Sequence, residues 1–341
     1  MTGQYWRLAL LASLALLTGQ PARAEPYPTR PIRLVVPYEF GGTIDPIGRI
    51  LVETLSEQLG QNIVVENKPG ANGNDGVAEV VRSPADGYTL GIASSNTLVA
   101  NPWLYASMPF DVERDVTPIV LYASLPNILV VNRSLPIKDL RQFTAYARAN
   151  PGKLSYGSTG IGSSMYLAAE LYKSRTDTFL VHIPFNSPGL ATHRLIEGEI
   201  DAMFQLVPGV LAQVRAGNLR PIGVLAGKRS SALPGVPTFA EQGLPIESAV
   251  WIMLLGPKDL PKPIVARLNR ETNRALGNPV LRGKLIQLGV EPLGGTSETA
   301  AKYRALGLAK WGKVLNRRHA SIDAGGADKA SGAPMREGAG R

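Results

Sequence analysis

The pattern that most constrains this chain is an apolar, strand-like run that ends in a turn of small residues and leads into a helix-like run. IRLVVPY is followed by GGTID and then by IGRILVETLSEQLG. In the last segment Ile47, Leu51 and Leu55 recur at helical spacing, and Gly60 ends the run. The same order returns further along the chain. Strands that alternate with helices are typical of α/β proteins, so we predict that fold class.

The remaining expected elements follow the same rhythm. The apolar run IVLYASLPNILVVN, residues 119–132, is long enough to pass between two domains. Strands are predicted over residues 32–38, 62–67, 88–93, 153–158, 180–185, 201–206 and 219–226. Helices are predicted over residues 46–60, 76–83, 96–105, 138–152, 163–174, 191–200, 210–219, 263–277 and 278–289.

The first residues predict export. Arg7 precedes the short apolar run LALLASLALLTG, and Ala22-Arg23-Ala24 has the small-x-small form of a cleavage site. The run is shorter than the roughly 20 residues that a membrane span needs, which favours a secretory signal over the alternative of an anchor. We therefore expect residues 1–24 to be removed and the mature protein to be periplasmic. The chain has no cysteine, so its core must stabilise it without disulfides.

Charge narrows the class of partner. The net charge is +9, and it is +7 without Arg7 and Arg23, which favours an anionic ligand. The basic residues are scattered and form no dense run with interleaved aromatic residues, so no nucleic-acid partner is expected. Residues 323–341 are rich in glycine and alanine without apolar periodicity, and we predict that they are disordered.

Three turns carry the candidate binding chemistry. Each offers backbone N–H groups and hydroxyls at the start of a helix, where roughly half a positive charge attracts anions. In open α/β sheets, ligands bind beyond the carboxyl ends of the strands. The alternative is ordinary helix capping, worth ~1 kcal/mol per cap, and Asp45 before Pro46 suits an N-cap. The turns contain Gly41, Gly42, Thr43 and Asp45; Ser94, Ser95, Asn96 and Thr97; and Ser158, Thr159, Gly160, Gly162, Ser163 and Ser164.

Other motifs lack the spacing that their chemistry requires. The glycines of residues 70–76 are spaced G-x-x-G-x-x-G, unlike the dinucleotide fingerprint, and residues 223–230 are too short for a phosphate loop. The three histidines show no metal-ligand spacing, and His182 is predicted to be a strand residue with a satisfied ring. Ser158 or Ser163 could act as a nucleophile, but the sequence pairs neither with a base. No cofactor, metal or catalytic residue is expected, and a hydrolase remains an alternative.

With these residues laid out, the chain resembles the extracytoplasmic solute receptors of the tripartite tricarboxylate transporters, the Bug family. The matching stretches include YPTRPIRLVVPYEFGGTID, LSEQLGQNIVVENKPGANGNDG, SPADGYTLGIASSNT and NPGKLSYGSTGIGSSMYLAAELY. The resemblance implies a type II periplasmic-binding-protein clamshell of two α/β domains with a cleft and a hinge. The implied domain 1 spans residues 25–123 and 230–322, and the implied domain 2 spans residues 124–229.

The resemblance also implies the activity. Such a receptor would capture a small organic carboxylate by hinge closure and deliver it to membrane permease subunits, acting as a monomer without a cofactor. A sensor that docks on a signalling receptor is the alternative that sequence leaves open. The predicted ligand-binding residues are those of the three turns together with Tyr38, Phe40, Phe185 and Gln205.

The chain departs from the pattern of this family at several predicted site positions. Thr43 and Ile44 stand where the family commonly has Gly and Thr, and Gln205 stands where Asp is frequent. Further departures are Glu39, Phe40, Leu98, Met165 and Tyr166. These changes make the expected pocket less polar and remove an acidic group. We therefore expect a carboxylate with a bulkier apolar or aromatic part.

Overall fold

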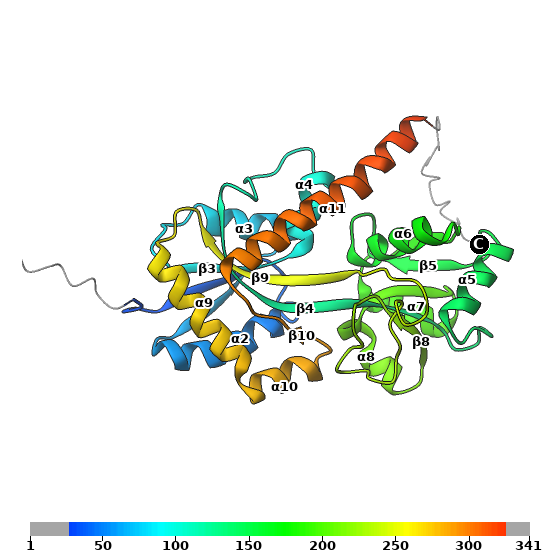
Figure 1. Cartoon of the computed structure of the whole chain (residues 1–341), viewed down its shortest axis with the longest axis horizontal. Coiled ribbons are helices and arrows are strands. Elements are labelled where there is room, and N and C mark those ends of the chain that lie inside the picture. Colours follow the sequence, from blue (N-terminus) through cyan, green and yellow to red (C-terminus); the bar gives the residue numbers. More distant parts are fainter. Residues whose placement is uncertain (1–26, 325–341) are drawn as a thin grey trace, which may run out of the picture.

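The computed structural model describes residues 27–324, with side chains described through residue 313. The predicted signal and most of the predicted tail lie outside the described residues. Two α/β lobes are joined by two strands, of which the longer is paired in both lobes (Figure 1). The predicted α/β fold with a clamshell-like pair of domains is confirmed.

The first lobe is a mixed sheet covered on both faces. Its strand order is β2-β1-β3-β9-β4, with β10 also paired to β4. β1 is parallel to β2 and β3, whereas β9 is antiparallel to β3 and β4. The strands are β1 (Ile32–Val36), β2 (Ile63–Asn67), β3 (Thr89–Ser94), β4 (Val116–Asn132), β9 (Ala249–Pro257) and β10 (Glu291–Pro292).

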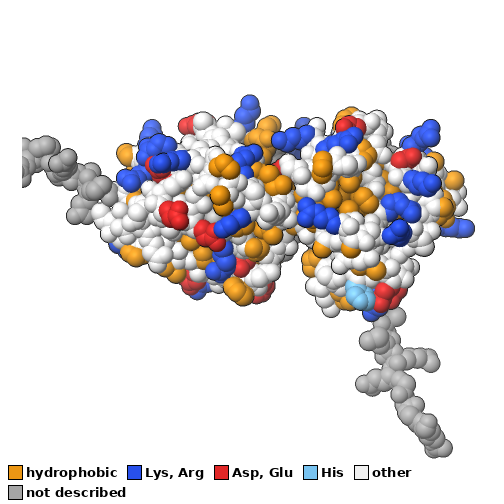
Figure 2. Space-filling model, turned by 90° about the horizontal axis from the view of Figure 1, so that it is seen from below, with side chains coloured by type: hydrophobic (Ala, Val, Ile, Leu, Met, Phe, Trp, Pro, Cys, Tyr) orange, Lys and Arg blue, Asp and Glu red, His pale blue; other side chains and the backbone are white. Residues whose placement is uncertain are grey.

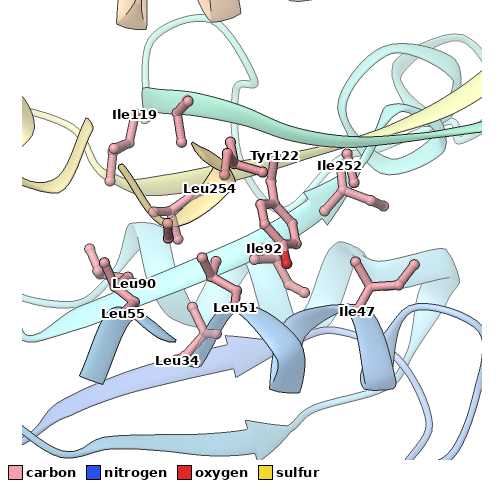
Figure 3. Close-up of a cluster of buried hydrophobic side chains, with 14 of the residues drawn as sticks. Leu34, Ile47, Leu51, Leu55, Leu90, Ile92, Ile119, Tyr122, Ile252 and Leu254 are labelled. Carbon is pink, nitrogen blue, oxygen red and sulfur yellow. The ribbon is translucent and has the colours of Figure 1, made fainter. Parts of the chain in front are cut away.

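Each face of this sheet has its own hydrophobic cluster and its own helices. One face carries α2 (Asp45–Leu59), α9 (Lys262–Gly277) and α10 (Pro279–Gln287). The other carries η1 (Ala71–Gly73), α3 (Asn74–Val81), η2 (Asn96–Ala100), α4 (Asn101–Leu104) and α11 (Ser297–Ala324). Figure 3 shows Leu51 and Leu55 of α2 directed at Leu34 and Leu90 of the sheet, beside Tyr122 of β4.

Helix α2 forms for the reason that the spacing predicts. Ile47, Leu51 and Leu55 are buried on one stripe, and full burial of each side chain contributes roughly 1.5–3 kcal/mol. Gly60 ends the helix in the left-handed conformation, with φ of 66°, as predicted. The predicted N-cap is wrong by one position, because Ile44 is the N-cap and Asp45 is already the first helical residue.

The second lobe repeats this architecture around the far end of β4. β7 and β8 both pair with β4 in antiparallel fashion, and β5 lies parallel between β7 and β6. The strands are β5 (Ser155–Ser158), β6 (Val181–Pro184), β7 (Ala202–Leu206) and β8 (Leu219–Val224). Helices α5 (Leu140–Ala149) and α6 (Ser164–Thr176) cover one face, and α7 (Pro188–Glu197) and α8 (Val207–Arg215) cover the other.

The chain crosses between the lobes on β4 and returns on β9. The long apolar run is one strand, β4. The strand that is hydrogen-bonded to it changes from β9 to β7 along its length. The sequence did not predict β9. Phe239 and Ile246, which precede β9, share a buried cluster with Tyr156 and Phe204 of the second lobe. We infer that the return lies near Ala249 rather than at the expected residue 230.

A second unpredicted element, α11, lies along both lobes. Trp311 packs against one cluster from each lobe. The backbone of α11 remains helical through Asp323 and Ala324, which are the first two residues of the segment that was expected to be disordered. None of the helices within residues 27–324 is long and apolar enough to span a bilayer.

Candidate functional site

The strand register directs the carboxyl ends in each lobe toward the other lobe. β3 ends at Ser94, which lies opposite Ile252, and Ile252 in turn lies opposite Ala123 near the middle of β4. From the other side, β7 ends at Leu206 opposite Asn127, and β5 runs parallel to it. The predicted turns after β1, β3 and β5 therefore all extend toward the crossing. Figure 2 shows a notch between the two lobes on one side of the molecule.

The first turn is closed by the carboxylate of Asp45. This side chain is buried and accepts hydrogen bonds from Gly41 N at 3.1 Å, Arg49 Nε at 3.0 Å and Asn67 Nδ2 at 2.9 Å. Burial alone would raise the pKa of Asp45, but the hydrogen bonds from Arg49 and Asn67 outweigh it and lower the pKa. Asp45 thus holds the shape of the turn and is saturated by partners within the protein.

The two glycines of the first turn do not offer the free N–H groups that were expected. The N–H of Gly41 donates to Asp45, and the N–H of Gly42 donates to Glu39 O at 3.0 Å. Within residues 27–324, the next two N–H groups, of Thr43 and Ile44, donate to no acceptor. Within the predicted turn, donor capacity therefore lies at Thr43 and Ile44 rather than at the two glycines, next to the start of α2, where such groups are normally left unpaired.

The second turn is tied to the first by a buried hydroxyl network. Tyr38 Oη accepts from Ser94 N at 2.9 Å and lies 3.0 Å from Thr97 Oγ1. Thr97 Oγ1 donates to Asn72 O at 2.8 Å. Burial raises the pKa of Tyr38, which keeps its phenol neutral. Tyr38, Ser94 and Thr97 are thus brought together as predicted, but they bond to one another.

The other two members of the second turn differ in their exposure. Ser95 is buried, and its Oγ accepts the N–H of Trp251 in β9 at 3.3 Å. Asn96 is half-buried and begins the π-helical turn η2. The second turn is therefore joined to the crossing strand β9 as well as to the first turn.

The third turn is organised by Ser158 and Ser163. Ser158 Oγ accepts from Gly160 N at 3.0 Å and lies 2.7 Å from His182 Nε2. Ser163 caps α6, because its Oγ accepts from Tyr166 N at 3.2 Å. Gly162 N and Ser164 N donate to no acceptor in the part of the chain that the structure describes. Thr159 and Ser164 are half-buried, so the side chains of this turn have partial access to solvent.

Two predicted residues outside the turns have contrasting environments. Phe185 is half-buried, with Cε2 3.2 Å from the position that a Cβ atom at Gly157 would occupy. Gln205 is 3% exposed, and its Oε1 accepts the N–H of Leu206 at 2.8 Å. Its Nε2 has no partner within the described residues. A buried donor without a partner costs free energy, so this amide is suited to a ligand or a water molecule.

Phe40 and Thr43 are exposed at the first turn, and Phe40 is 76% exposed. The guanidinium carbon of Arg49 lies 5.0 Å from the centre of the Phe40 ring. Sequence reasoning did not assign Arg49, Asn67 and Leu104 to the site, whereas His182 is, as predicted, a strand residue whose ring has a hydrogen-bond partner. The i,i+4 spacing of Asp45 and Arg49 on the expected helix was a local signal for Arg49, whereas Asn67 is brought to Asp45 only by the fold.

The pairing of Ser158 with His182 bears on the hydrolase alternative. A serine and a base lie within hydrogen-bond reach, as a nucleophile would require. Ser158 is fully buried, however, and its oxygen already accepts the N–H of Gly160. A nucleophile must reach its substrate, so this geometry does not support acyl transfer. No group of acidic, histidine or cysteine side chains within residues 27–324 could hold a metal ion.

A separate cavity of about 560 Å³ draws its walls from both lobes. Leu225 and Lys228 contribute from the second lobe, and Leu293, Leu306 and Trp311 from β10 onward. None of the predicted ligand-binding residues lines it. This cavity is therefore distinct from the three turns.

Comparison with known proteins gives the family. The model of the tripartite tricarboxylate transporter family receptor matches residues 47–319. BugT of Bordetella pertussis is 34% identical over 304 residues, which are 89% of this chain and 93% of BugT. The R. palustris protein Rpa4515, solved with adipate, is 34% identical with a TM-score of 0.76, over 85% of this chain and 97% of that one.

A third similar structure is MatC from Rhodopseudomonas palustris with bound malate, 29% identical with a TM-score of 0.72, over 85% of this chain and 100% of that one. These matches confirm the family resemblance and the fold that the sequence predicted. The chain belongs to the receptor family of the tripartite tricarboxylate transporters, whose members are periplasmic solute-binding proteins and not enzymes.

Proposed function

We propose that this receptor captures a small carboxylate between its two lobes, at the first and third turns, and releases it to a membrane permease. The observation that carries the proposal is the strand register, which extends the turns of both lobes toward the same crossing. Turns on one lobe alone could hold an anion, but they could not couple its capture to closure. A ligand that bridges both lobes couples its capture to closure of the lobes.

The donors for the carboxylate are the unpaired groups of those turns. In the first lobe they are the N–H groups of Thr43 and Ile44, and in the second those of Gly162 and Ser164, with Gln205 Nε2 nearby at the end of β7. Micromolar affinity requires about −8 kcal/mol. Several charge-assisted hydrogen bonds of ~1.5–3 kcal/mol each can supply it after the cost of ordering the ligand and the turns.

Closure by hinge bending is supported by how the lobes are built. Each lobe has its own buried clusters and its own covering helices, so each can move as a unit. The backbone passes between them on β4 and returns on β9, while α11 packs along both lobes. A ligand that contacts both lobes stabilises the closed state by its differential affinity for that state.

The ligand is expected to have an apolar body. Phe40 is exposed beside the first turn, and Phe185 is half-buried beside the third. The similar protein Rpa4515 was solved with adipate, whose methylene chain separates two carboxylates. A linear dicarboxylate or an aromatic carboxylate therefore suits this chain better than a short hydroxy acid such as malate.

Export, a monomeric state and delivery to permease subunits complete the proposal. Export is supported by the signal-like residues 1–24, and delivery to a permease by the name of the matching family. Uptake of the identified ligand by cells that lack this receptor would test delivery, since a sensor would leave uptake unchanged.

Native mass spectrometry of the freshly purified protein, followed by a thermal-shift panel of carboxylates, tests the proposal. We expect adipate and benzoate-like acids to raise Tm and malate to do so weakly. Tight binding of malate with no response to any longer or aromatic acid would contradict the apolar body. A panel without any response would contradict carboxylate capture itself.

A further inference from the structure

We propose that His182 is a positioning residue for the third turn and makes carboxylate capture tighter as the pH falls. The inference rests on the proposed function, because it assumes that the third turn receives the carboxylate. Neutral His182 accepts the hydroxyl of Ser158, whereas protonated His182 donates to the same oxygen. The two states differ in charge and in the direction of one hydroxyl group directly behind the turn.

The sheet places these two side chains together. In the parallel pair of β5 and β6, Tyr156 lies opposite His182. Ser158 is two residues beyond Tyr156, so its side chain leaves the same face of the sheet. Ser158 Oγ is 2.7 Å from His182 Nε2. Nothing in the sequence between residues 158 and 182 signals this contact, which arises only from the register.

Two aromatic rings fix the direction of the imidazole. The Tyr156 ring stacks on His182 with centroids 5.0 Å apart and an angle of 29°. The Tyr166 ring, from the first turn of α6, lies at 5.0 Å with a tilt of 59°. A ring held between two neighbours cannot turn away from Ser158 without disturbing both of them. The two rings therefore hold His182 Nε2 in contact with one oxygen atom, Ser158 Oγ.

The groups around His182 together lower its pKa from the ordinary value, which favours the neutral ring at neutral pH. Burial lowers its pKa, Glu170 on α6 raises it, and Lys173 on the same helix lowers it. Glu170 Oε1 accepts from both Lys173 Nζ at 2.8 Å and Tyr156 Oη at 2.9 Å, so the two charges largely offset each other. No further acidic or basic group acts on His182 in the part of the chain that the structure describes.

The hydroxyl of Ser158 has one hydrogen and two acceptor positions. One position accepts the N–H of Gly160 at 3.0 Å in either state. When His182 Nε2 carries no proton, the Ser158 hydrogen points at it. When Nε2 is protonated, it occupies the second acceptor position, and the Ser158 hydrogen turns elsewhere, with Gly160 O at 3.4 Å as the neighbouring acceptor.

Protonation also adds charge where an anion is expected. The imidazolium would lie one hydrogen bond behind a turn that starts the 13-residue helix α6, whose N-terminus already carries partial positive charge. A bound carboxylate then stabilises the charged form of His182. By linkage, ligand affinity rises as the pH falls from the pKa of His182 in the complex towards its lower pKa in the free protein, and levels off below that.

The pairing is tested without ligand by NMR of the imidazole nitrogens in the whole chain. The chain has only three histidines, so the signals of His182 are identified by their loss in His182→Gln. We expect neutral His182 to carry its proton on Nδ1 and to titrate below the ordinary pKa of histidine. A neutral form protonated on Nε2, or one whose tautomer is unchanged in Ser158→Ala, would overturn the proposal.

The consequence is tested with adipate by calorimetry between about pH 5.5 and pH 8, where carboxylates stay largely ionised. We expect about threefold to tenfold tighter binding at the acidic end. His182→Gln places a permanent N–H donor near the position of Nε2, so its affinity should lose this pH dependence. His193→Gln is the matched control, because His193 is exposed on α7 and pairs with Glu197 at 3.1 Å. It should keep the wild-type slope.

The outcomes separate the two proposals. Adipate binding that is independent of pH in the wild type, or a wild-type slope in His182→Gln, overturns the role of His182 and leaves carboxylate capture standing. Failure of adipate to bind at any pH, together with a silent carboxylate panel, overturns both.

Discussion

Leu104 of α4 lies directly over Gly162 of the third turn, so that a Cβ atom at Gly162 would be 2.5 Å from Leu104 Cδ1. Leu104 belongs to the first lobe by sequence, yet it packs against the buried cluster of the second lobe. The contact joins the helix that follows the second turn to the third turn. Side-chain contact between the lobes is thus made at the candidate site itself.

We predict that Gly162→Ala lowers the free energy of unfolding by about 1–2 kcal/mol and weakens adipate binding. Gly162 has φ of +86°, which strains any residue with a Cβ, and the new atom must also displace Leu104. Urea unfolding and calorimetry measure the two effects. Gly160→Ala is the matched control, since it has φ of +100° but nothing within 4 Å of the new atom. Equal binding losses in both variants would contradict a role for Leu104.

Asp45→Asn should destabilise the protein by about 1–3 kcal/mol at neutral pH, because Arg49 loses its charged partner and Gly41 a strong acceptor. The pKa of Asp45 is lowered in the folded state, so its contribution is present above the unfolded pKa and is lost as the pH falls through the folded one. The stability gap between wild type and variant should therefore close in acid. Urea titrations at pH 7 and near pH 3 measure it, and a gap that is constant with pH would contradict this role.

Tyr38→Phe and Tyr122→Phe should have opposite effects on stability. Removing the Tyr38 hydroxyl leaves Ser94 N without its acceptor and takes one of the partners of Thr97 Oγ1, which keeps Asn72 O, at a cost of about 1–2 kcal/mol. The Tyr122 hydroxyl is buried and has no partner within residues 27–324, so its removal should be neutral or stabilising. Thermal unfolding of the two variants tests the pair. A loss of the same size in both would show that the network around Tyr38 adds nothing.

Gln205→Met should weaken adipate binding about threefold to tenfold and lower stability less than the control variant does. The Nε2 group of Gln205 has no partner among the described residues, so the protein loses only the hydrogen bond that Oε1 accepts from Leu206 N, while a ligand would lose a donor. Gln242→Met is the matched control. Gln242 Nε2 donates to Ile222 O at 3.0 Å, and its Oε1 accepts from Leu140 N at 2.9 Å. Gln242→Met should lose stability and keep its affinity for adipate. If Gln242→Met loses affinity and Gln205→Met keeps it, the ligand does not bind beside β7.

The sequence by itself determined the local pattern of this protein. The helical spacing of Ile47, Leu51 and Leu55, the stop at Gly60 and the long apolar run of β4 depend on neighbours along the chain, and all three appear as predicted. The family and the fold class followed from stretches of the same kind. Strand β9 and helix α11 escaped prediction, since their partners lie far away in sequence.

Tertiary structure alone decided which polar groups in the turns are available. Whether an N–H or a hydroxyl is free depends on acceptors brought in from distant segments. Asn67 reaches Asp45, Asn72 reaches Thr97, and His182 reaches Ser158, and none of these pairs has a local signal. The glycines that looked like donors are used to close the first turn, and the open donors lie beside them.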